Sequence, residues 1–132
     1  MRNACDVLGL ASDASFPLAC VGESHYQAAL EAISGPRSEE GVDLEVEACV
    51  RLENTNPYDP EAVRIDVDGR TVGYLSRPDA RAYRRALESV GVAEVLTCRG
   101  CIRGGWDRGQ RDRGHYGIYL DLPLYGLRPR DD

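Results

Sequence analysis

Residues 44–52 alternate between apolar and polar side chains, and this pattern constrains the fold more than any other feature of the chain. Neighbouring side chains of an extended strand point to opposite faces, so this segment predicts a strand with one buried face. The alternation returns over residues 63–67 and 116–122. Between these segments, Asp68-Gly69 predicts a tight hairpin turn, because glycine tolerates the positive φ that such turns need. Strands joined by tight turns predict a largely antiparallel sheet.

Two helices are predicted between the strands. Residues 26–34 have apolar side chains at helical spacing and stop at Gly35-Pro36. The second helix follows Ser76, a good N-cap, and ends at Gly91. Further strands are predicted over residues 16–21, 71–75 and 94–102. The order β-α-β-β-β-α-β-β predicts a mainly β (α+β) fold, a small, partly open barrel of the OB or SH3 type with about six strands.

The boundaries of the domain follow from the same patterns. Residues 1–15 show no periodicity, and we expect a flexible N-terminal arm there. One domain is expected over residues 16–127, followed by a frayed tail over residues 128–132. A chain of 132 residues is long enough to bury a core of its own.

Charge is distributed unevenly along the chain. The net charge is −6, which argues against a protein that coats DNA. Residues 1–66 hold 13 acidic side chains and 4 Arg, whereas residues 67–132 hold 9 and 12. Lys is absent, which suits either a G- and C-rich genome or a need for bidentate donors. The basic side chains gather in two clusters, Arg77, Arg81, Arg84 and Arg85, and Arg99, Arg103, Arg108, Arg111 and Arg113.

The five cysteines and two histidines predict neither a disulfide framework nor a metal site. The pair Cys98 and Cys101 is a lone CxxC, and on a strand this spacing puts the two side chains on opposite faces. No apolar segment has the length of a signal peptide or a membrane span. We therefore expect a cytoplasmic protein with no cofactor, no metal and no membrane contact.

No catalytic residues are predicted. Glu23-Ser24-His25 contains the residue types of a triad, but adjacent residues do not form that geometry. A motif for nucleotide hydrolysis is missing. The weakest alternative is a metal-dependent nuclease built on Asp59, Asp66, Asp68 and Asp121.

Three stretches together resemble the HIRAN domain. They are Val21-Gly22-Glu23-Ser24-His25-Tyr26, then Leu52 to Val63 with the turn Asn56-Pro57-Tyr58-Asp59, then Val72-Gly73-Tyr74-Leu75 before an Ala-containing helix. The resemblance extends over about residues 16–122. It implies an OB-like barrel without catalytic activity that binds single-stranded DNA at its free 3′-hydroxyl end, and a role in DNA repair.

The resemblance also implies roles for individual side chains. Tyr58 and His25 would contact the terminal base, and aromatic stacking of this kind does not read sequence. Asp59 and Asn56 would bind the hydroxyl and the sugar, since a carboxylate accepts from a hydroxyl and repels a phosphate. The remaining candidates are the phosphate-binding Arg77 and Arg81 and the ring surface of Tyr26, Tyr74 and Tyr116. Among the four tyrosines named here, we expect Tyr58 to be exposed. We expect Tyr26 and Tyr74 to be partly in the core.

Each of these features has a structural alternative. The Asn56–Asp59 turn is also explained by Asn and Asp capping their own backbone. The Arg-rich loop over residues 103–114, expected to be mobile, is either a phosphate clamp or a solvated surface loop. The alternative function is a protein–protein interaction module that keeps the fold but has lost DNA binding.

Overall fold

The computed structural model describes residues 1–124, so the predicted frayed tail over residues 128–132 lies outside the described residues. The predicted order of strands and of the two longer helices is confirmed, and two short helices, α1 and η1, are additional. The elements are α1 (Ala4–Leu8), β1 (Leu18–Ala19), η1 (Glu23–His25), α2 (Gln27–Ser34), β2 (Val42–Leu52), β3 (Val63–Val67), β4 (Arg70–Tyr74), α3 (Arg77–Ser89), β5 (Leu96–Gly104) and β6 (Gly117–Leu120).

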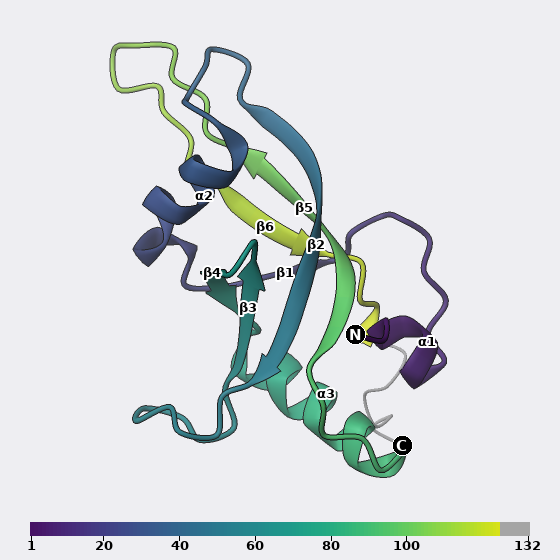
Figure 1. Cartoon of the computed structure of the whole chain (residues 1–132). Coiled ribbons are helices and arrows are strands. Elements are labelled where there is room, and N and C mark those ends of the chain that lie inside the picture. Colours follow the sequence, from purple (N-terminus) through teal and green to yellow (C-terminus); the bar gives the residue numbers. More distant parts are fainter. Residues whose placement is uncertain (125–132) are drawn as a thin grey trace, which may run out of the picture.

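The six strands form one antiparallel sheet in the order β1-β6-β5-β2-β3-β4. Its long strand β2 pairs with β5 over residues 42–50 and with β3 over residues 49–52 (Figure 1). The two edges of the sheet meet at Val21 and Tyr74, which exchange N–H···O bonds of 2.8 and 2.9 Å. The sheet is therefore a partly open barrel, and the predicted OB-like α+β fold is confirmed.

The sequence patterns explain the main elements. In β2, Ala48 and Val50 are fully buried, whereas Glu45 and Glu47 are exposed, as the alternation predicts. The β3–β4 hairpin turns at Asp68 and Gly69 with φ of 50° and 72°, the left-handed values of a tight turn. Helix α3 begins after Ser76, whose Oγ accepts a hydrogen bond from the backbone N–H of Asp79 at 3.3 Å.

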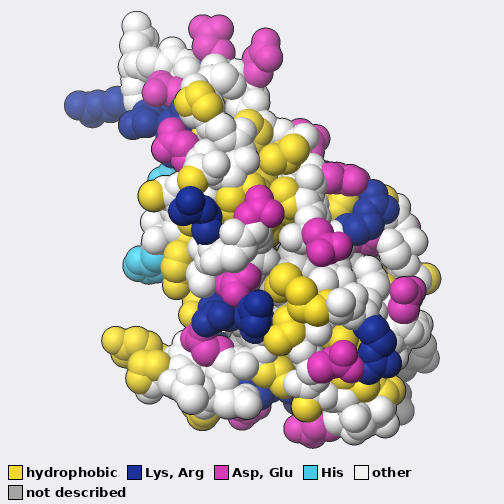
Figure 2. Space-filling view, viewed as in Figure 1, with side chains coloured by type: hydrophobic (Ala, Val, Ile, Leu, Met, Phe, Trp, Pro, Cys, Tyr) yellow, Lys and Arg dark blue, Asp and Glu magenta, His cyan; other side chains and the backbone are white. Residues whose placement is uncertain are grey.

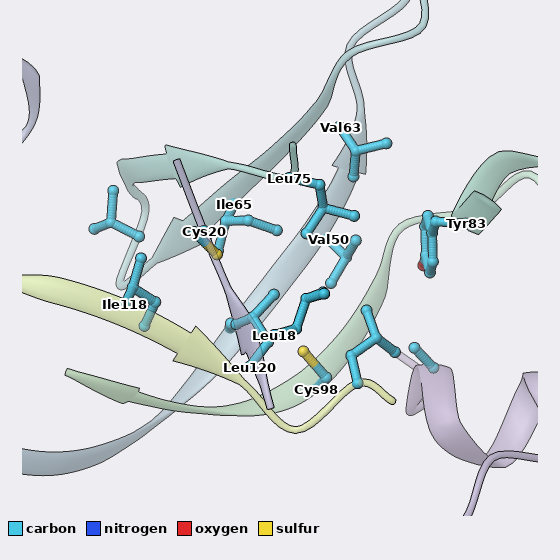
Figure 3. Packing of buried hydrophobic residues seen from close by; sticks show 14 of the residues in the cluster. Leu18, Cys20, Val50, Val63, Ile65, Leu75, Tyr83, Cys98, Ile118 and Leu120 are labelled. Atoms are coloured by element: carbon cyan, nitrogen blue, oxygen red, sulfur yellow. The ribbon is translucent and has the colours of Figure 1, made fainter. Parts of the chain in front are cut away.

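The core lies inside the barrel and continues down to α3. Figure 3 shows Leu18, Val50, Ile65, Ile118 and Leu120 directed toward one another from β1, β2, β3 and β6. Tyr83 and Leu87 of α3 belong to the same buried cluster. The helix therefore closes one end of the barrel with its apolar side, and its Arg-rich side is left at the surface.

The N-terminal segment differs from the flexible arm that we expected over residues 1–15. Helix α1 is capped by the Asn3 side chain, and its Ala4 and Cys5 are buried in the core. The backbone N–H of Thr97 in β5 donates to the carbonyl of Arg2 at 2.9 Å. A helix of five residues is too short to show periodicity or to be stable alone, so its structure comes from packing against the barrel.

The CxxC pair lies on β5, and its predicted placement on opposite faces is confirmed. Cys98 is part of the core, whereas the Cys101 thiol donates to Asp43 Oδ1 at 2.8 Å. Burial raises the pKa of the Cys98 thiol far above its ordinary range. Over residues 1–124, no three His, Cys, Asp or Glu side chains are grouped so as to hold a metal ion. Over the same residues, no helix has the length and apolar character needed to cross a bilayer.

Candidate functional site

A hollow of about 470 Å³ lies beside the point where the two edges of the barrel meet. Its walls come from the segment after β1, the loop between β2 and β3, the end of β4 and the start of α3. Figure 1 shows the β2–β3 loop projecting to the left from the body of the protein. Six of the nine predicted binding residues line this hollow: His25, Asn56, Tyr58, Asp59, Tyr74 and Arg77.

The Asn56 side chain shapes the turn on one side of the hollow. Its Oδ1 accepts hydrogen bonds from the backbone N–H groups of Tyr58 at 2.8 Å and Asp59 at 3.0 Å. Its Nδ2 donates to Glu53 Oε1 at 2.8 Å. Such a bonded Asn replaces a backbone turn, and this turn carries the Tyr58 ring outward. Tyr58 is accordingly 90% exposed, the most exposed large apolar side chain over residues 1–124.

Asp59 supplies the carboxylate of the hollow. Its side chain is 15% exposed, and its Oδ1 accepts from the backbone N–H of Glu61 at 3.0 Å. Two guanidinium groups of α3 approach it, with N···O distances of 3.8 Å from Arg77 and 3.9 Å from Arg81. These distances exceed those of a direct hydrogen bond. The carboxylate therefore lies near positive charge and keeps acceptor capacity.

Arg84 of α3 holds the loop in place and does not line the hollow. Its three guanidinium nitrogens donate to the carbonyl of Glu61 at 2.6 Å, the carbonyl of Ala62 at 2.8 Å and Asn54 Oδ1 at 2.8 Å. All three acceptors belong to the β2–β3 loop. One member of the basic helix face thus supports the loop and is not free for a ligand.

Tyr74 forms part of the opposite wall. Its hydroxyl donates to Glu53 Oε1 at 2.8 Å, and its ring lies 6.3 Å from that of Tyr26. His25 and Tyr26 make an edge contact at 6.5 Å. Burial, followed by the bond to Glu53, raises the pKa of Tyr74 well above its ordinary value. Tyr26 and Tyr74 are half-buried, as expected, and Tyr58 is the exposed ring.

Tyr116 is not part of this surface, although we expected it to be. It is 1% exposed, and its hydroxyl donates to the carbonyl of Gly35 at 2.9 Å. The cause is its strand register, because the alternation over residues 116–122 turns this ring inward. A Cβ at Gly105 would lie 2.2 Å from the ring, so the chain passes directly over it.

In the second basic cluster, four of the five arginines lie within 4 Å of a carboxylate of residues 1–124. We call Arg77, Arg81, Arg84 and Arg85 the helix cluster and Arg99, Arg103, Arg108, Arg111 and Arg113 the loop cluster. In the loop cluster, Arg99 lies 2.6 Å from Glu45, Arg113 3.2 Å from Asp107 and Arg103 3.5 Å from Asp43. The loop is also tied down by Arg37, which donates to the carbonyl of Gly114 at 2.6 Å. These contacts favour a solvated surface loop over a phosphate clamp.

Over the described residues 1–124, the carboxylates of the nuclease alternative do not form a group that could hold a metal ion. Asp66 accepts from two nitrogens of Arg64 at 3.1 Å each. Asp121 lines a different hollow, beside α1.

Sequence reasoning missed Glu53 and Arg84 as residues that build the site. For Glu53 the available signal was its position between an alternating strand and a turn rich in Asn and Pro.

Comparison with known proteins covers the part of the chain that builds the hollow. The family model described as HIRAN domain matches residues 16–104, which include every residue that lines the hollow. The match ends before β6, whereas we expected the resemblance to reach about residue 122. No curated protein and no solved structure matches the chain. The family is one of nucleic-acid-binding modules rather than catalytic domains. With two thirds of its length matched, the chain belongs to the HIRAN domain family.

Proposed function

We propose that this protein binds single-stranded DNA at a free 3′-hydroxyl end, in the hollow beside Tyr58, and does so without catalysis. The observation that carries the proposal is the convergence of an exposed aromatic ring, a carboxylate and the guanidinium of Arg77 on one hollow. All of them lie within the part of the chain that matches a nucleic-acid-binding family.

Tyr58 is the stacking residue of the proposal. An exposed ring beside a hollow can stack on a terminal base of any sequence, at about 1–3 kcal/mol per base. His25 offers a second ring on the far side of the hollow. In this arrangement a base enters between the β2–β3 loop and the segment after β1.

Asp59 is the hydroxyl acceptor of the proposal, and Arg77 and Arg81 are the phosphate ligands. The carboxylate accepts from a terminal hydroxyl and repels a terminal phosphate. The two guanidinium groups lie within 4 Å of it and are 70% and 38% exposed, so they can turn to an internucleotide phosphate. Asn56 contributes by shaping the turn, because both of its polar atoms already have partners within the loop.

Fluorescence anisotropy with a short labelled strand tests the proposal. The strand carries a free or a phosphorylated 3′ end and is titrated with the wild type and with Asp59→Asn. Asparagine can still accept the bond from Glu61 but has no negative charge. The wild type should prefer the free end, and Asp59→Asn should bind both strands alike. Equal affinity of the wild type for both strands would remove the end-recognition claim.

A second candidate is a protein–protein interaction module, which the charge distribution favours. The net charge is −6, and Figure 2 shows basic and acidic side chains interspersed over the visible face without a continuous basic surface. This candidate predicts a partner that is retained in a pull-down after nuclease treatment and no binding of either DNA strand at low salt.

We also propose that the protein works in the cytoplasm. This is a reducing compartment, which suits its five free cysteines.

A further inference from the structure

Two walls of the hollow come from separate parts of the chain and share one carboxylate. Glu53 directly follows β2, and its Oε1 accepts hydrogen bonds from Asn56 Nδ2 and from the Tyr74 hydroxyl, both at 2.8 Å. Its Oε2 accepts from Arg64 Nη1 at 2.9 Å. The side chain is 16% exposed. Glu53 thus joins the Asn56–Asp59 turn to β4 without lining the hollow itself.

The carboxylate is held in its charged form. Burial by itself would raise the pKa of Glu53, but the hydrogen bonds from Tyr74, Asn56 and Arg64 outweigh it, and the pKa is lowered. Arg64 is fixed in turn, since it binds both oxygens of Asp66 at 3.1 Å. The network therefore connects the turn to the rigid sheet.

Glu53 also determines which way the Asn56 amide points. The amide has one accepting and one donating end, and Glu53 can only accept. With Nδ2 directed to Glu53, Oδ1 must face the N–H groups of Tyr58 and Asp59. The reversed amide would place oxygen against carboxylate and NH₂ against two N–H donors. A single carboxylate thus orients the amide that sets the backbone of Tyr58 and Asp59.

We infer that Glu53 is a positioning residue of the binding site, acting through Asn56 and Tyr74 to hold Tyr58 and Asp59 in place. The consequence for DNA binding rests on the proposed function. The consequence for the free protein does not depend on it, and this separates the two tests.

The first test measures amide hydrogen exchange of Tyr58 and Asp59 in the free protein. In Glu53→Ala, exchange at these two amides should be about tenfold faster, the effect of losing a hydrogen bond to a charged group. Glu53→Gln should stay near the wild type, because its oxygen can still accept from Asn56 and Tyr74. Glu47→Ala, which removes an exposed carboxylate of β2, is the control. Amides of β5 must stay protected in every variant, which shows that the barrel is folded. Unchanged exchange in a folded Glu53→Ala overturns the inference.

A second set of variants tests the inference if Glu53→Ala does not fold. It exchanges the carboxylate and the amide between positions 53 and 56. Asn56→Asp sets a carboxylate against Glu53, and exchange at Tyr58 and Asp59 should rise. Adding Glu53→Gln supplies an NH₂ group to the new carboxylate and should return exchange to within a few-fold of the wild type. If Asn56→Asp speeds exchange at Tyr58 and Asp59 equally, whether position 53 is Glu or Gln, the inference is contradicted.

The second test measures DNA binding, with the ratio of affinities for free and phosphorylated 3′ ends as the readout. Glu53→Ala should reduce this ratio, and Glu53→Gln should restore most of it. If the wild type itself shows no preference, the proposed function fails while the exchange result still decides the role of Glu53 in the turn. If the wild type prefers the free end and a folded Glu53→Ala keeps the full preference, the positioning role is refuted.

Discussion

The helix cluster and the loop cluster look alike in the sequence but are used differently in the structure. In the helix cluster, Arg77 and Arg81 approach Asp59 only to 3.8 and 3.9 Å, beside a hollow with an exposed ring. In the loop cluster, Arg99 binds Glu45 at 2.6 Å, and its guanidinium lies 5.9 Å from the ring of Phe16. Arg108 lies 5.6 Å from the ring of Trp106.

The difference shows that positive charge in the sequence is not the same as positive charge available to a ligand. A guanidinium that already binds a carboxylate and stacks on a ring gains little by turning to a phosphate. A guanidinium beyond hydrogen-bond distance of its carboxylate loses less when it does so. We therefore expect Arg77 and Arg81 of the helix cluster, rather than the loop cluster, to contact nucleic acid, and four experiments test this comparison.

The largest expected effect concerns the backbone of the loop side. Gly105 and Gly22 both have positive φ, of 71° and 78°, but a Cβ at Gly105 would lie 2.2 Å from the Tyr116 ring, whereas Gly22 has no atom within 4 Å. Gly105→Ala should cost about 2–4 kcal/mol of unfolding free energy through strain and overpacking. Gly22→Ala, on the hollow side, should cost about 1–2 kcal/mol, the strain of a left-handed conformation alone. Urea unfolding checks both values, and equal losses would show that the loop side is not tightly packed.

The next effect concerns the exposed ring of Tyr58 and the half-buried ring of Tyr119. Tyr58→Ala should weaken binding of a short single strand about tenfold or more, because one stacked base is lost. Tyr119 lies on the other side, with Arg103 5.5 Å from its ring, and Tyr119→Ala should leave binding within about twofold, an energy below that of one stacked base. Anisotropy titration measures both. A larger loss in Tyr119→Ala would move the interface to the loop cluster.

A smaller effect distinguishes the arginines. Arg77→Ala should weaken binding and reduce the salt dependence of the affinity by about 0.7 in the log–log slope, the value for one phosphate contact of a single strand. Arg113, which is paired with Asp107 at 3.2 Å, should show neither change when replaced by Ala. Titrations at several salt concentrations give the slopes. Similar slopes for the two variants would contradict the assignment of phosphate contacts to the helix cluster.

The smallest effect is a pH dependence of stability. The pKa of Glu53 in the folded protein lies below its ordinary value of 4.5, so its charged form stabilises the fold above that pH and the contribution is lost as the pH falls through the folded pKa. The difference in urea midpoint between the wild type and Glu53→Gln should be widest above pH 4.5 and should narrow as the pH falls through the lowered pKa of Glu53. Asp107→Asn, which removes an exposed partner of Arg113, should cost under about 1 kcal/mol. A difference for Glu53→Gln that is constant with pH would show that its charge is not used.

The sequence alone determined the main elements of the barrel. The alternation over residues 44–52 determined which side of β2 is buried, Asp68-Gly69 determined the hairpin, and Ser76 determined the start of α3. It also pointed to the Asn56–Asp59 turn and to Tyr58 as the exposed ring. These features depend on residues close together in the chain, whose periodicity and backbone preferences can be read directly.

Only the tertiary structure decided which side chains share the hollow and which are used elsewhere. Tyr116 is buried by its register, Arg84 holds the β2–β3 loop, and Glu53 joins the turn to Tyr74. Even helix α1 exists because the barrel covers it. Each of these outcomes depends on contacts between segments far apart in the chain. Strand pairing and packing set such contacts, and a local pattern of residues does not specify which distant side chains meet.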